Sequence, residues 1–320
     1  MPELGHEDTE EAIMKNCSES RDETVALLAL LRTVPHGMTW GNIASEVRLT
    51  GSAKAVLEKT LGNQGTLFPD PVLDNVLIQA DAELSDWEAD GLDLITVLSK
   101  RYPTHLAGVF DCPPFLFVRG TVIPDDRGMS VVGSRKASSE GLAMAQMASR
   151  LLTERGLTVI AGLATGIDAA AHREALRIGA RTVAVIGTGI RQYYPASNRA
   201  LQDEIASHGL VISQFYPDQP PNKHTFPMRN GTMSGYGLAT IVVEAGERSG
   251  SRIQAREAAD HGRPVILSNK VATTTTWGAQ MAQNPWVFVA DSYGRLAESI
   301  DQILEDNRND FLQSLGLVSA

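Results

Sequence analysis

The 320-residue sequence has few of the features that mark exported, membrane-spanning or metal-binding chains. It contains two cysteines, Cys17 and Cys112, which lie far apart without metal-ligand spacing around them, so neither a disulfide framework nor a zinc site is expected. The N-terminus is acidic, and no apolar run approaches the roughly 18 residues of a transmembrane helix. We therefore expect a cytoplasmic chain with no membrane partner and no bound metal.

Three motifs of nucleotide and hydrolytic enzymes are also missing. No G-x-G-x-x-G with a suitably placed acidic residue follows the first predicted strand of the sheet, which disfavours NAD and FAD as cofactors. The sequence has no G-x-x-x-x-G-K-[ST] of a P-loop ATPase and no G-x-S-x-G nucleophile elbow. We therefore predict no cofactor.

Acidic residues outnumber basic residues, and the excess is confined to the N-terminal part of the sequence. The 28 Lys and Arg residues face 38 Asp and Glu residues, a net charge of −10. Residues 1–127 hold 10 basic and 21 acidic residues, a net of −11, whereas residues 128–320 hold 18 against 17, a net of +1. Because phosphate contacts depend on a few placed cations rather than on the total, the overall acidity excludes no nucleic-acid ligand.

Composition and periodicity divide the chain into three segments. Residues 1–22 are rich in carboxylates and poor in apolar residues, which predicts a disordered acidic tail. Residues 23–98 are mainly helical, with Thr39 as a candidate N-cap, and predict a small helical domain. That domain is either a packing module or a contact surface for protein or DNA. Residues 99–310 are predicted to form a Rossmann-like domain.

In the third segment, apolar runs rich in Val and Ile alternate with helical stretches. Strands that are apolar throughout are covered on both faces, and their alternation with helices indicates βαβ units. The predicted fold class is therefore α/β, an extended Rossmann-like, doubly wound parallel sheet with a small N-terminal helical domain. The predicted strands are 129–132, 158–161, 182–186, 210–213, 240–244, 264–267 and 286–289, and the predicted helices are 139–155, 168–178, 198–208, 251–261 and 292–305.

Ligands of such sheets bind beyond the carboxyl ends of the strands, where glycine-rich turns lead into helices. The first such turn follows the strand at 129–132. Gly133 permits a tight turn, Ser134 and the exposed amides suit a phosphate, and Arg135 and Lys136 supply positive charge. An ordinary strand-to-helix turn with a serine N-cap is the competing interpretation.

The second turn contains Gly162, Thr165 and Gly166 and leads into a helix near Asp168. A carboxylate at this position suits the positive end of the helix dipole. His172 lies four residues later on the same helix face, so the pair forms either a structural hydrogen bond or, as the weaker interpretation, a catalytic dyad.

The remaining turns offer further ligand groups. Gly187 and Gly189 allow close backbone approach, and the tyrosines at 193 and 194 either stack on a base or pack in the core. A basic and aromatic loop at 223–237, placed before a short helix, suits a nucleotide strand. The predicted contacts of that loop and of the last turn are Arg229, Asn230, Ser249, Gly250 and Ser251.

Taken together, these turns resemble the DprA/Smf family of DNA-processing proteins over about residues 102–267. The resemblance rests on the order and spacing of a whole series of short motifs. They are Tyr102-Pro, Arg119-Gly120, Val132-Gly-Ser-Arg135, Gly162-Leu-Ala-Thr-Gly-Ile-Asp168, Ala171-His172, Gly187-Thr-Gly189, Tyr194-Pro195, Phe226-Pro-Met-Arg-Asn230, Val243-Glu-Ala245 and Ser249-Gly-Ser251.

The resemblance implies a homodimer and a positively charged pocket that holds single-stranded DNA. It further implies a non-catalytic protein that protects incoming DNA and assists loading of a RecA-type recombinase during transformation. Lys136 is added to the pocket on charge alone. Carried over by position, the pocket residues are Gly133, Ser134, Arg135, Gly162, Gly166, Arg229 and Asn230.

Two departures from the family pattern leave alternatives open. Gly231 stands where the family usually has a second arginine, and Ser268-Asn269 stands where it usually has Pro-Gly. These changes suit a divergent paralogue, an antitoxin-like partner of a phosphoribosyltransferase toxin in phage defence that senses a nucleotide. A third hypothesis is a nucleotide phosphoribohydrolase, suggested by Gly231-Thr232 and Glu244.

Overall fold

The structure, a computed structural model, describes residues 20–34, 37–61 and 71–314. It consists of two compact units. The helical unit comprises residues 1–102 and 110–116, and the Rossmann unit comprises residues 103–109 and 117–320. Of the acidic tail predicted for residues 1–22, residues 1–19 with Cys17 lie outside the described residues, and Arg21 and Asp22 already belong to a helix. The predicted boundary at residues 98 and 99 stays a prediction.

The helical unit is built around helix α2. Leu27, Leu30 and Ile43 are among its fully buried side chains. The predicted cap at Thr39 is confirmed, because its hydroxyl accepts from the Asn42 amide while the Asn42 side chain accepts from the Thr39 amide. Its elements are α2 (Arg21–Thr33), α3 (Trp40–Thr50), α4 (Ala53–Leu61), α5 (Pro71–Ala89), β1 (Asp93–Thr96) and the start of β2 (Phe115–Gly120).

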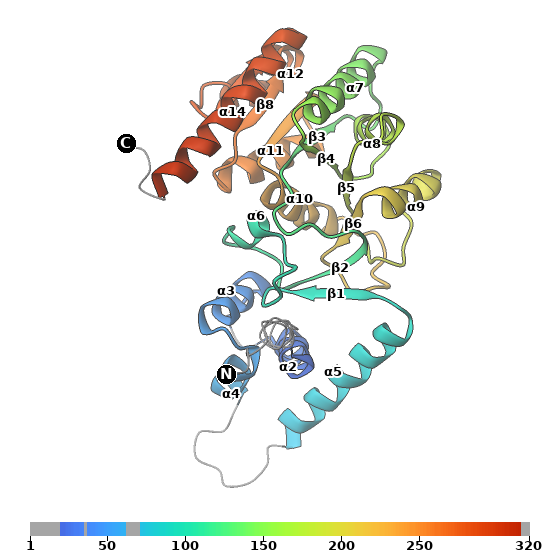
Figure 1. Ribbon diagram of the computed structural model, residues 1–320, viewed down its shortest axis with the longest axis vertical. Coiled ribbons are helices and arrows are strands. Elements are labelled where there is room, and N and C mark those ends of the chain that lie inside the picture. Colours follow the sequence, from blue (N-terminus) through green and yellow to red (C-terminus); the bar gives the residue numbers. More distant parts are fainter. Residues whose placement is uncertain (1–19, 35–36, 62–70, 315–320) are drawn as a thin grey trace, which may run out of the picture. The chain divides into compact units, whose positions relative to one another are not determined.

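The Rossmann unit alternates strands and helices as predicted, and Figure 1 follows this order by colour. Each of the seven predicted strands is present within one residue of the expected bounds, and the predicted fold class is confirmed. The elements are α6 (Thr104–Ala107), β3 (Gly128–Gly133), α7 (Ser139–Glu154), β4 (Thr158–Ala161), α8 (Ile167–Arg177), β5 (Thr182–Val185), η1 (Ala196–Asn198), α9 (Arg199–His208), β6 (Leu210–Ser213), α10 (Thr225–Tyr236), β7 (Ala239–Glu244), α11 (Gly250–Asp260), β8 (Val265–Ser268), α12 (Asn269–Thr274), α13 (Thr276–Met281), β9 (Val287–Ala290) and α14 (Tyr293–Ser314).

The strand order in this unit is β2-β6-β5-β4-β3-β7-β8-β9. Strand β2 runs antiparallel to β6, and the strands from β6 to β9 pair in parallel. From β3 the chain adds β4, β5 and β6 on one side, whereas β7, β8 and β9 follow on the other. The order therefore reverses between β3 and β7, and a sheet of this kind binds its ligand at such a reversal.

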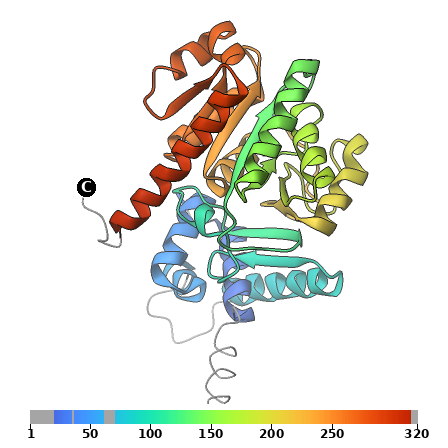
Figure 2. The same ribbon diagram turned by 45° about the horizontal axis from the view of Figure 1, so that its top comes forward.

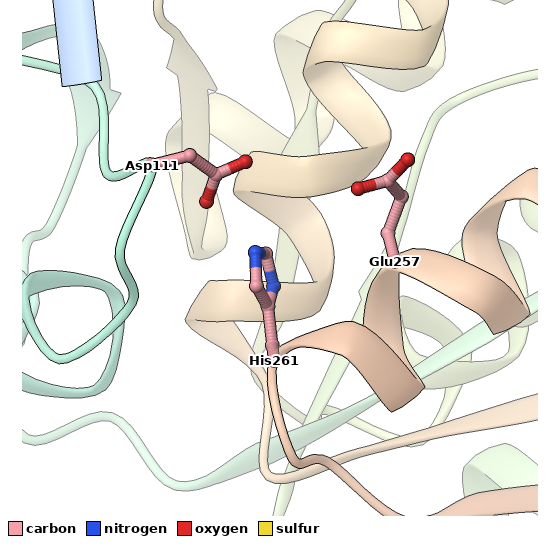
Figure 3. A group of neighbouring side chains, drawn as sticks. All are labelled: Asp111, Glu257 and His261. Atoms are coloured by element: carbon pink, nitrogen blue, oxygen red, sulfur yellow. The ribbon is translucent and has the colours of Figure 1, made fainter. Parts of the chain in front are cut away.

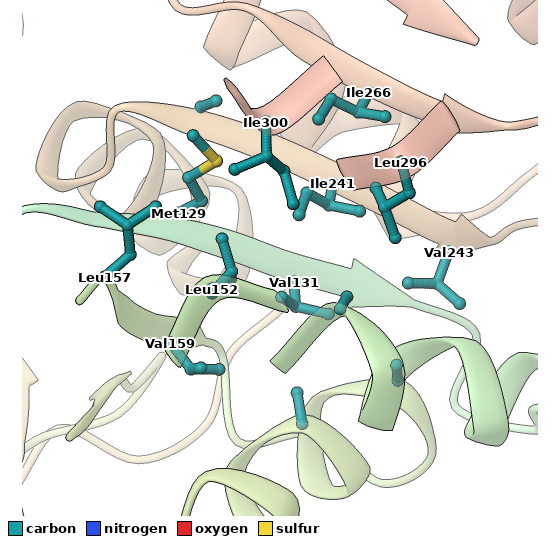
Figure 4. Close-up of a cluster of buried hydrophobic side chains, with 14 of the residues drawn as sticks. Met129, Val131, Leu152, Leu157, Val159, Ile241, Val243, Ile266, Leu296 and Ile300 are labelled. Atoms are coloured by element: carbon teal, nitrogen blue, oxygen red, sulfur yellow. The ribbon is translucent and has the colours of Figure 1, made fainter. Parts of the chain in front are cut away.

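Alternate residues of the central strands face different layers of helices, as the period of two requires. Val131 and Ile241 belong to a buried apolar cluster with residues of α7 and α14 (Figure 4). Their neighbours face the other way: the Ser130 hydroxyl donates to the carbonyl of Met233 in α10 at 3.3 Å. Figure 2 shows α7, in green, and α14, in red, beside the sheet. Both faces are covered, which explains the apolar strands.

One predicted element was wrong. Residues 223–237 were expected to form a loop before a short helix, but α10 spans Thr225–Tyr236 and contains most of that segment. At least one glycine of this helix is required by packing. A Cβ on Gly235 would lie 2.9 Å from the Leu106 side chain of α6.

Candidate functional site

A pocket of about 410 Å³ lies at the strand-order reversal, and we call it the switch-point pocket. It is formed by the loops after β3, β4 and β7 and by the first turns of α10 and α11. Four of the five predicted turns therefore meet in one place. The lining residues are Val132, Gly133, Ser134, Arg135, Ala164, Asp168, Phe226, Arg229, Asn230, Met233, Gly246, Arg248, Ser249, Gly250, Ser251 and Gln254.

The turn after β3 is tied to the end of β7. The Ser134 amide donates to the carbonyl of Glu244 at 2.7 Å, and the Ser134 hydroxyl accepts from the Lys136 amide at 3.1 Å. The exposed Arg135 guanidinium lies 5.6 Å from the centre of the Phe226 ring. Of the two predicted cations, Arg135 lines the pocket, whereas Lys136 lines a neighbouring hollow between α7 and α8.

At two positions of the turn after β4, neighbouring atoms leave no room for a side chain. Gly166, with φ of +80°, is the N-cap of α8, and a Cβ there would lie 2.2 Å from the Ser134 carbonyl oxygen. A Cβ on Gly162 would lie 2.1 Å from Nη1 of Arg229. Glycine is therefore needed here for space, and at Gly166 also for the backbone conformation. The Thr165 hydroxyl lies 3.4 Å from the Arg135 carbonyl oxygen.

Asp168 and His172 have separate partners. The Asp168 carboxylate accepts from the amides of Gly162 and Ala164 at 3.1 and 3.3 Å, so it holds the turn. Burial raises its pKa, opposed chiefly by the nearby Arg229 guanidinium.

The fully buried His172 pairs through Nδ1 with the Thr182 hydroxyl at 2.7 Å. Burial lowers the pKa of His172 to about 3, so the imidazole is neutral. Both the expected Asp168–His172 hydrogen bond and the weaker dyad hypothesis are wrong, because each side chain bonds elsewhere.

Arg229 was predicted to lie in a loop and to contact a nucleotide. It is instead a buried residue of α10 that lines the switch-point pocket, and its contact with a nucleotide stays a prediction. Its Nη1 donates to the carbonyls of Gly162 and Val185 at 2.5 and 2.7 Å, and its Nε donates to the Asn230 side chain at 3.1 Å. Burial is the main effect that lowers its pKa. The guanidinium thus joins the ends of β4 and β5 to α10, and Nη2 has no hydrogen-bond partner in the described chain.

The turn after β7 leads into the N-terminus of α11. The Ser249 hydroxyl caps this helix by accepting from the Ser251 amide at 3.2 Å, and the Gly250 amide has no acceptor among residues 20–34, 37–61 and 71–314. Arg248 is exposed at the rim, and no carboxylate pairs with it in the part of the chain described. Unpaired amides and cations at a helix N-terminus suit an anion.

Arg248 and Gln254 line the pocket but were not predicted as contacts. Arg248 stands inside the quoted turn, so its charge was a usable signal. Gln254 is nearly fully buried, its Nε2 lies 3.5 Å from the Thr240 hydroxyl, and its Oε1 has no partner among the described residues. In the sequence, only the position of Gln254 one helical turn after Gly250 indicates that it could reach the pocket.

The third turn does not line the pocket but supports it from outside. A Cβ on Gly187 would lie 2.7 Å from the Phe226 ring, and one on Gly189 would lie 2.2 Å from the Pro217 carbonyl oxygen. The hydroxyl of Tyr193 donates to Asp203 at 2.8 Å, while the Tyr194 ring, 39% exposed, lies 5.5 Å from that of Phe226. Gly187 and Gly189 therefore allow packing.

Two features that suggested a phosphoribohydrolase are engaged in structural contacts. Thr232 is buried in α10, where its hydroxyl donates to Gln214. Glu244 ends β7, accepts from the amide and the hydroxyl of Ser138, and forms an ion pair with Lys270 at 3.0 Å. Ser138 in turn caps α7, so Glu244 holds the loop that carries Arg135.

At the other end of α11, Glu257 and His261 lie one turn apart (Figure 3). The His261 amide donates to the Glu257 carbonyl at 3.0 Å, and its Nδ1 pairs with the Ser234 hydroxyl of α10 at 2.8 Å. His261 thus links α10 to α11 away from the pocket. Asp111, also labelled in Figure 3, belongs to the helical unit. Cys112 of that unit is a buried free thiol.

Comparison with known families decides the identity of the chain. A family model described as DNA recombination-mediator protein A matches residues 93–306, which is more than half of the sequence. The chain belongs to this family. Within the described residues, every helix is too short or too polar to cross a bilayer.

The relatives are DNA-processing proteins. The chain is 40% identical to DNA processing protein DprA of Streptococcus pneumoniae over 187 residues, which cover 58% of this chain and 66% of that protein. A solved structure of DprA from Streptococcus pneumoniae matches 90% of this chain and 95% of its own, with a TM-score of 0.62 and 30% identity.

A second structure has the same fold at lower identity. It comes from work on the single-stranded DNA binding mode of DNA processing protein A from Helicobacter pylori, and it matches 66% of this chain and 96% of its own with a TM-score of 0.59 and 20% identity. The aligned region spans 62% and 66% of the length of the curated relatives from Bacillus subtilis and Streptococcus pneumoniae.

Proposed function

We propose that the chain binds the sugar–phosphate backbone of single-stranded DNA in the switch-point pocket. The observation that carries this proposal is that two arginines of the pocket have no ion-pair partner among the described residues. Arg135 and Arg248 line the pocket, are exposed, and have no carboxylate partner among the described residues. Together with Arg229 they face one lining carboxylate, Asp168, which is itself bound to two backbone amides.

Elsewhere in the Rossmann unit many arginines are neutralised. The ion pairs include Arg181 with Asp126 at 2.9 Å and Arg191 with Asp218 at 2.7 Å. Within the described residues Arg135 and Arg248 have no such partner, and together with Arg229 they gather around one pocket, where they create the positive potential that a phosphodiester requires. The backbone amides of Arg135 and Gly250 have no acceptor among the described residues, and they add neutral donors for phosphate oxygens.

Aromatic rings beside the cations favour a single strand over a duplex. Phe226 lines the pocket, and the half-exposed Tyr194 lies against it. Bases of a single strand stack on such rings, whereas paired bases are already stacked on one another. The Helicobacter pylori relative is named for its single-stranded DNA binding, which agrees with this proposal.

Beyond the pocket, we propose that the chain protects DNA, acts as a homodimer and assists a RecA-type recombinase without catalysis of its own. Membership of the family supports this proposal. Its test is co-purification with the recombinase and measurement of molar mass in solution. The partner role towards a phosphoribosyltransferase and the sensing of a small nucleotide stay predictions from the sequence.

The pocket proposal is tested by titrating a fluorescein-labelled oligo(dT) with the full chain and recording fluorescence anisotropy. Arg135→Glu should weaken binding by at least about tenfold, because it reverses a charge that contacts phosphate. Arg308→Glu is the matched control. Arg308 is exposed, and its neighbours Asp306 and Asn307 lie with Val265 at the amino end of β8, away from the pocket. Equal losses in both variants, or no binding by the natural chain, would overturn the proposal.

A further inference from the structure

A second hollow, of about 460 Å³, lies next to the switch-point pocket between α7 and α8. The two share Arg135, so they are neighbours across one side chain. We call the second one the α7–α8 hollow. Its lining residues are Arg135, Lys136, Ala137, Leu142, Gln146, Gly166, Ala170 and Arg173.

The lining of this hollow carries positive charge that no lining carboxylate neutralises. It contains three cations, Arg135, Lys136 and Arg173, and no carboxylate. All three are exposed, and no acidic partner pairs with any of them in the described chain. Among the described residues the Arg173 guanidinium has one hydrogen bond, to the Asn198 side chain at 3.4 Å, which is long and therefore weak.

The nearest carboxylates in the sequence are occupied or face elsewhere. Glu174, next to Arg173, is buried and forms ion pairs with Arg150 and Arg177 at 2.5 and 2.7 Å. Glu140, in the first turn of α7, lines a different pocket beside Lys270. The positive charge of the α7–α8 hollow is therefore available to an external anion.

We propose that the α7–α8 hollow is a second phosphate subsite for the same DNA strand. The strand passes Arg135 as it leaves the switch-point pocket, and a phosphate farther along the strand lies against Lys136 and Arg173. The Gln146 amide offers a further hydrogen-bond group, and Ala137, Leu142 and Ala170 give an apolar surface for the sugars. This inference rests on the proposed function, because it extends the path of the strand bound there.

The test compares the natural chain with the double variant Lys136→Gln/Arg173→Gln on (dT)12 and on (dT)3, a ligand too short to occupy both sites. The variant should bind (dT)12 about tenfold more weakly but bind (dT)3 with unchanged affinity. The slope of log K against log salt for (dT)12 should become less negative by about 0.7 for each phosphate that the variant no longer neutralises. Arg308→Gln is the control and should change neither quantity.

The other possible outcomes distinguish the second phosphate subsite from DNA binding in the switch-point pocket. Unchanged affinity and salt slope for (dT)12 in the double variant would overturn the second subsite while the pocket proposal stands. An equal decrease in affinity for (dT)3 and (dT)12 would also overturn it. If inorganic phosphate binds in a way that depends on Lys136 and Arg173 while the double variant keeps full affinity for (dT)12, the hollow binds free phosphate rather than the strand, and the second subsite is overturned. Absence of binding by the natural chain would overturn both claims.

Discussion

The close approach of Gly162 and Arg229 gives a specific test of how the pocket is built. In Gly162→Ala the new Cβ would lie 2.1 Å from Nη1 of Arg229, whereas ordinary contacts begin near 3.4 Å. The guanidinium must therefore move, although its Nη1 is fixed by the carbonyls of Gly162 and Val185 at 2.5 and 2.7 Å. Overpacking costs about 1–3 kcal/mol, and weakened hydrogen bonds to a buried charge add to this.

We therefore expect Gly162→Ala to lower the free energy of unfolding by about 2–4 kcal/mol, measured by urea denaturation. Gly294→Ala is the matched control, since nothing lies within 4 Å of its added Cβ. Gly294 stands in the first turn of α14, where alanine favours the helix, so the control should be neutral or slightly stabilised.

A double-mutant cycle identifies Arg229 as the cause. The flexible methionine side chain of Arg229→Met leaves room for the new methyl group. In that background Gly162→Ala should cost at least about 1 kcal/mol less than it does in the natural chain. Additivity of the two substitutions within about 0.5 kcal/mol would refute the argument, because it would show that the cost of Gly162→Ala does not depend on the guanidinium.

Two further predictions concern groups around the pocket. Burial holds the pKa of His172 at about 3 against a usual value of 6.5. As the pH falls, the imidazole is therefore protonated in the unfolded chain before it is protonated in the folded one. The resulting stability is present above pH 6.5 and is lost as pH falls towards 3, by about 1.4 kcal/mol per pH unit. Urea denaturation from about pH 7 to about pH 5 should show this slope flattened in His172→Gln, and an unchanged slope would contradict the assignment. Glu244→Ala should lower the free energy of unfolding by about 2 kcal/mol, because Ser138 and Lys270 lose a charged partner. It should also weaken oligo(dT) binding; full affinity would show that Glu244 does not position the Arg135 loop.

Much of the Rossmann unit could be predicted because its signals are local. Strand β4 has the same bounds in the structure as in the prediction, Thr158–Ala161. Burial on both faces makes such strands apolar throughout, so they stand out in a single sequence. The sequence also predicts that the turns after the strands carry the ligand groups, because the carboxyl ends of parallel strands lie at one edge of the sheet, and the first and last of these turns line one pocket.

What the sequence could not show depends on contacts between distant segments. Gly235 belongs to a helix because Leu106 and Val109, far away in sequence, lie against it. The position of Arg229 depends on the carbonyls of Gly162 and Val185, which bind its guanidinium, so the sequence could not show that this cation is buried.

The direction of a side chain is equally invisible in a sequence. Lys136 was assigned to the same site as Arg135, but it lines only the α7–α8 hollow, whereas Arg135 lines both this hollow and the switch-point pocket. Arg173 showed no signal at all, because it follows His172 in a helix and only the fold brings it to the same hollow as Lys136.

The salt dependence of binding to (dT)12 tests the central claim most directly. Arg135, Arg248, Lys136 and Arg173 are expected to bind phosphates, and about 0.7 for each of them gives a slope of log K against log salt near about −2.8. The account predicts this slope for the natural chain and one that is less negative by about 0.7 for Arg135→Gln. A slope near zero, or one that Arg135→Gln leaves unchanged, would contradict phosphate binding in the switch-point pocket.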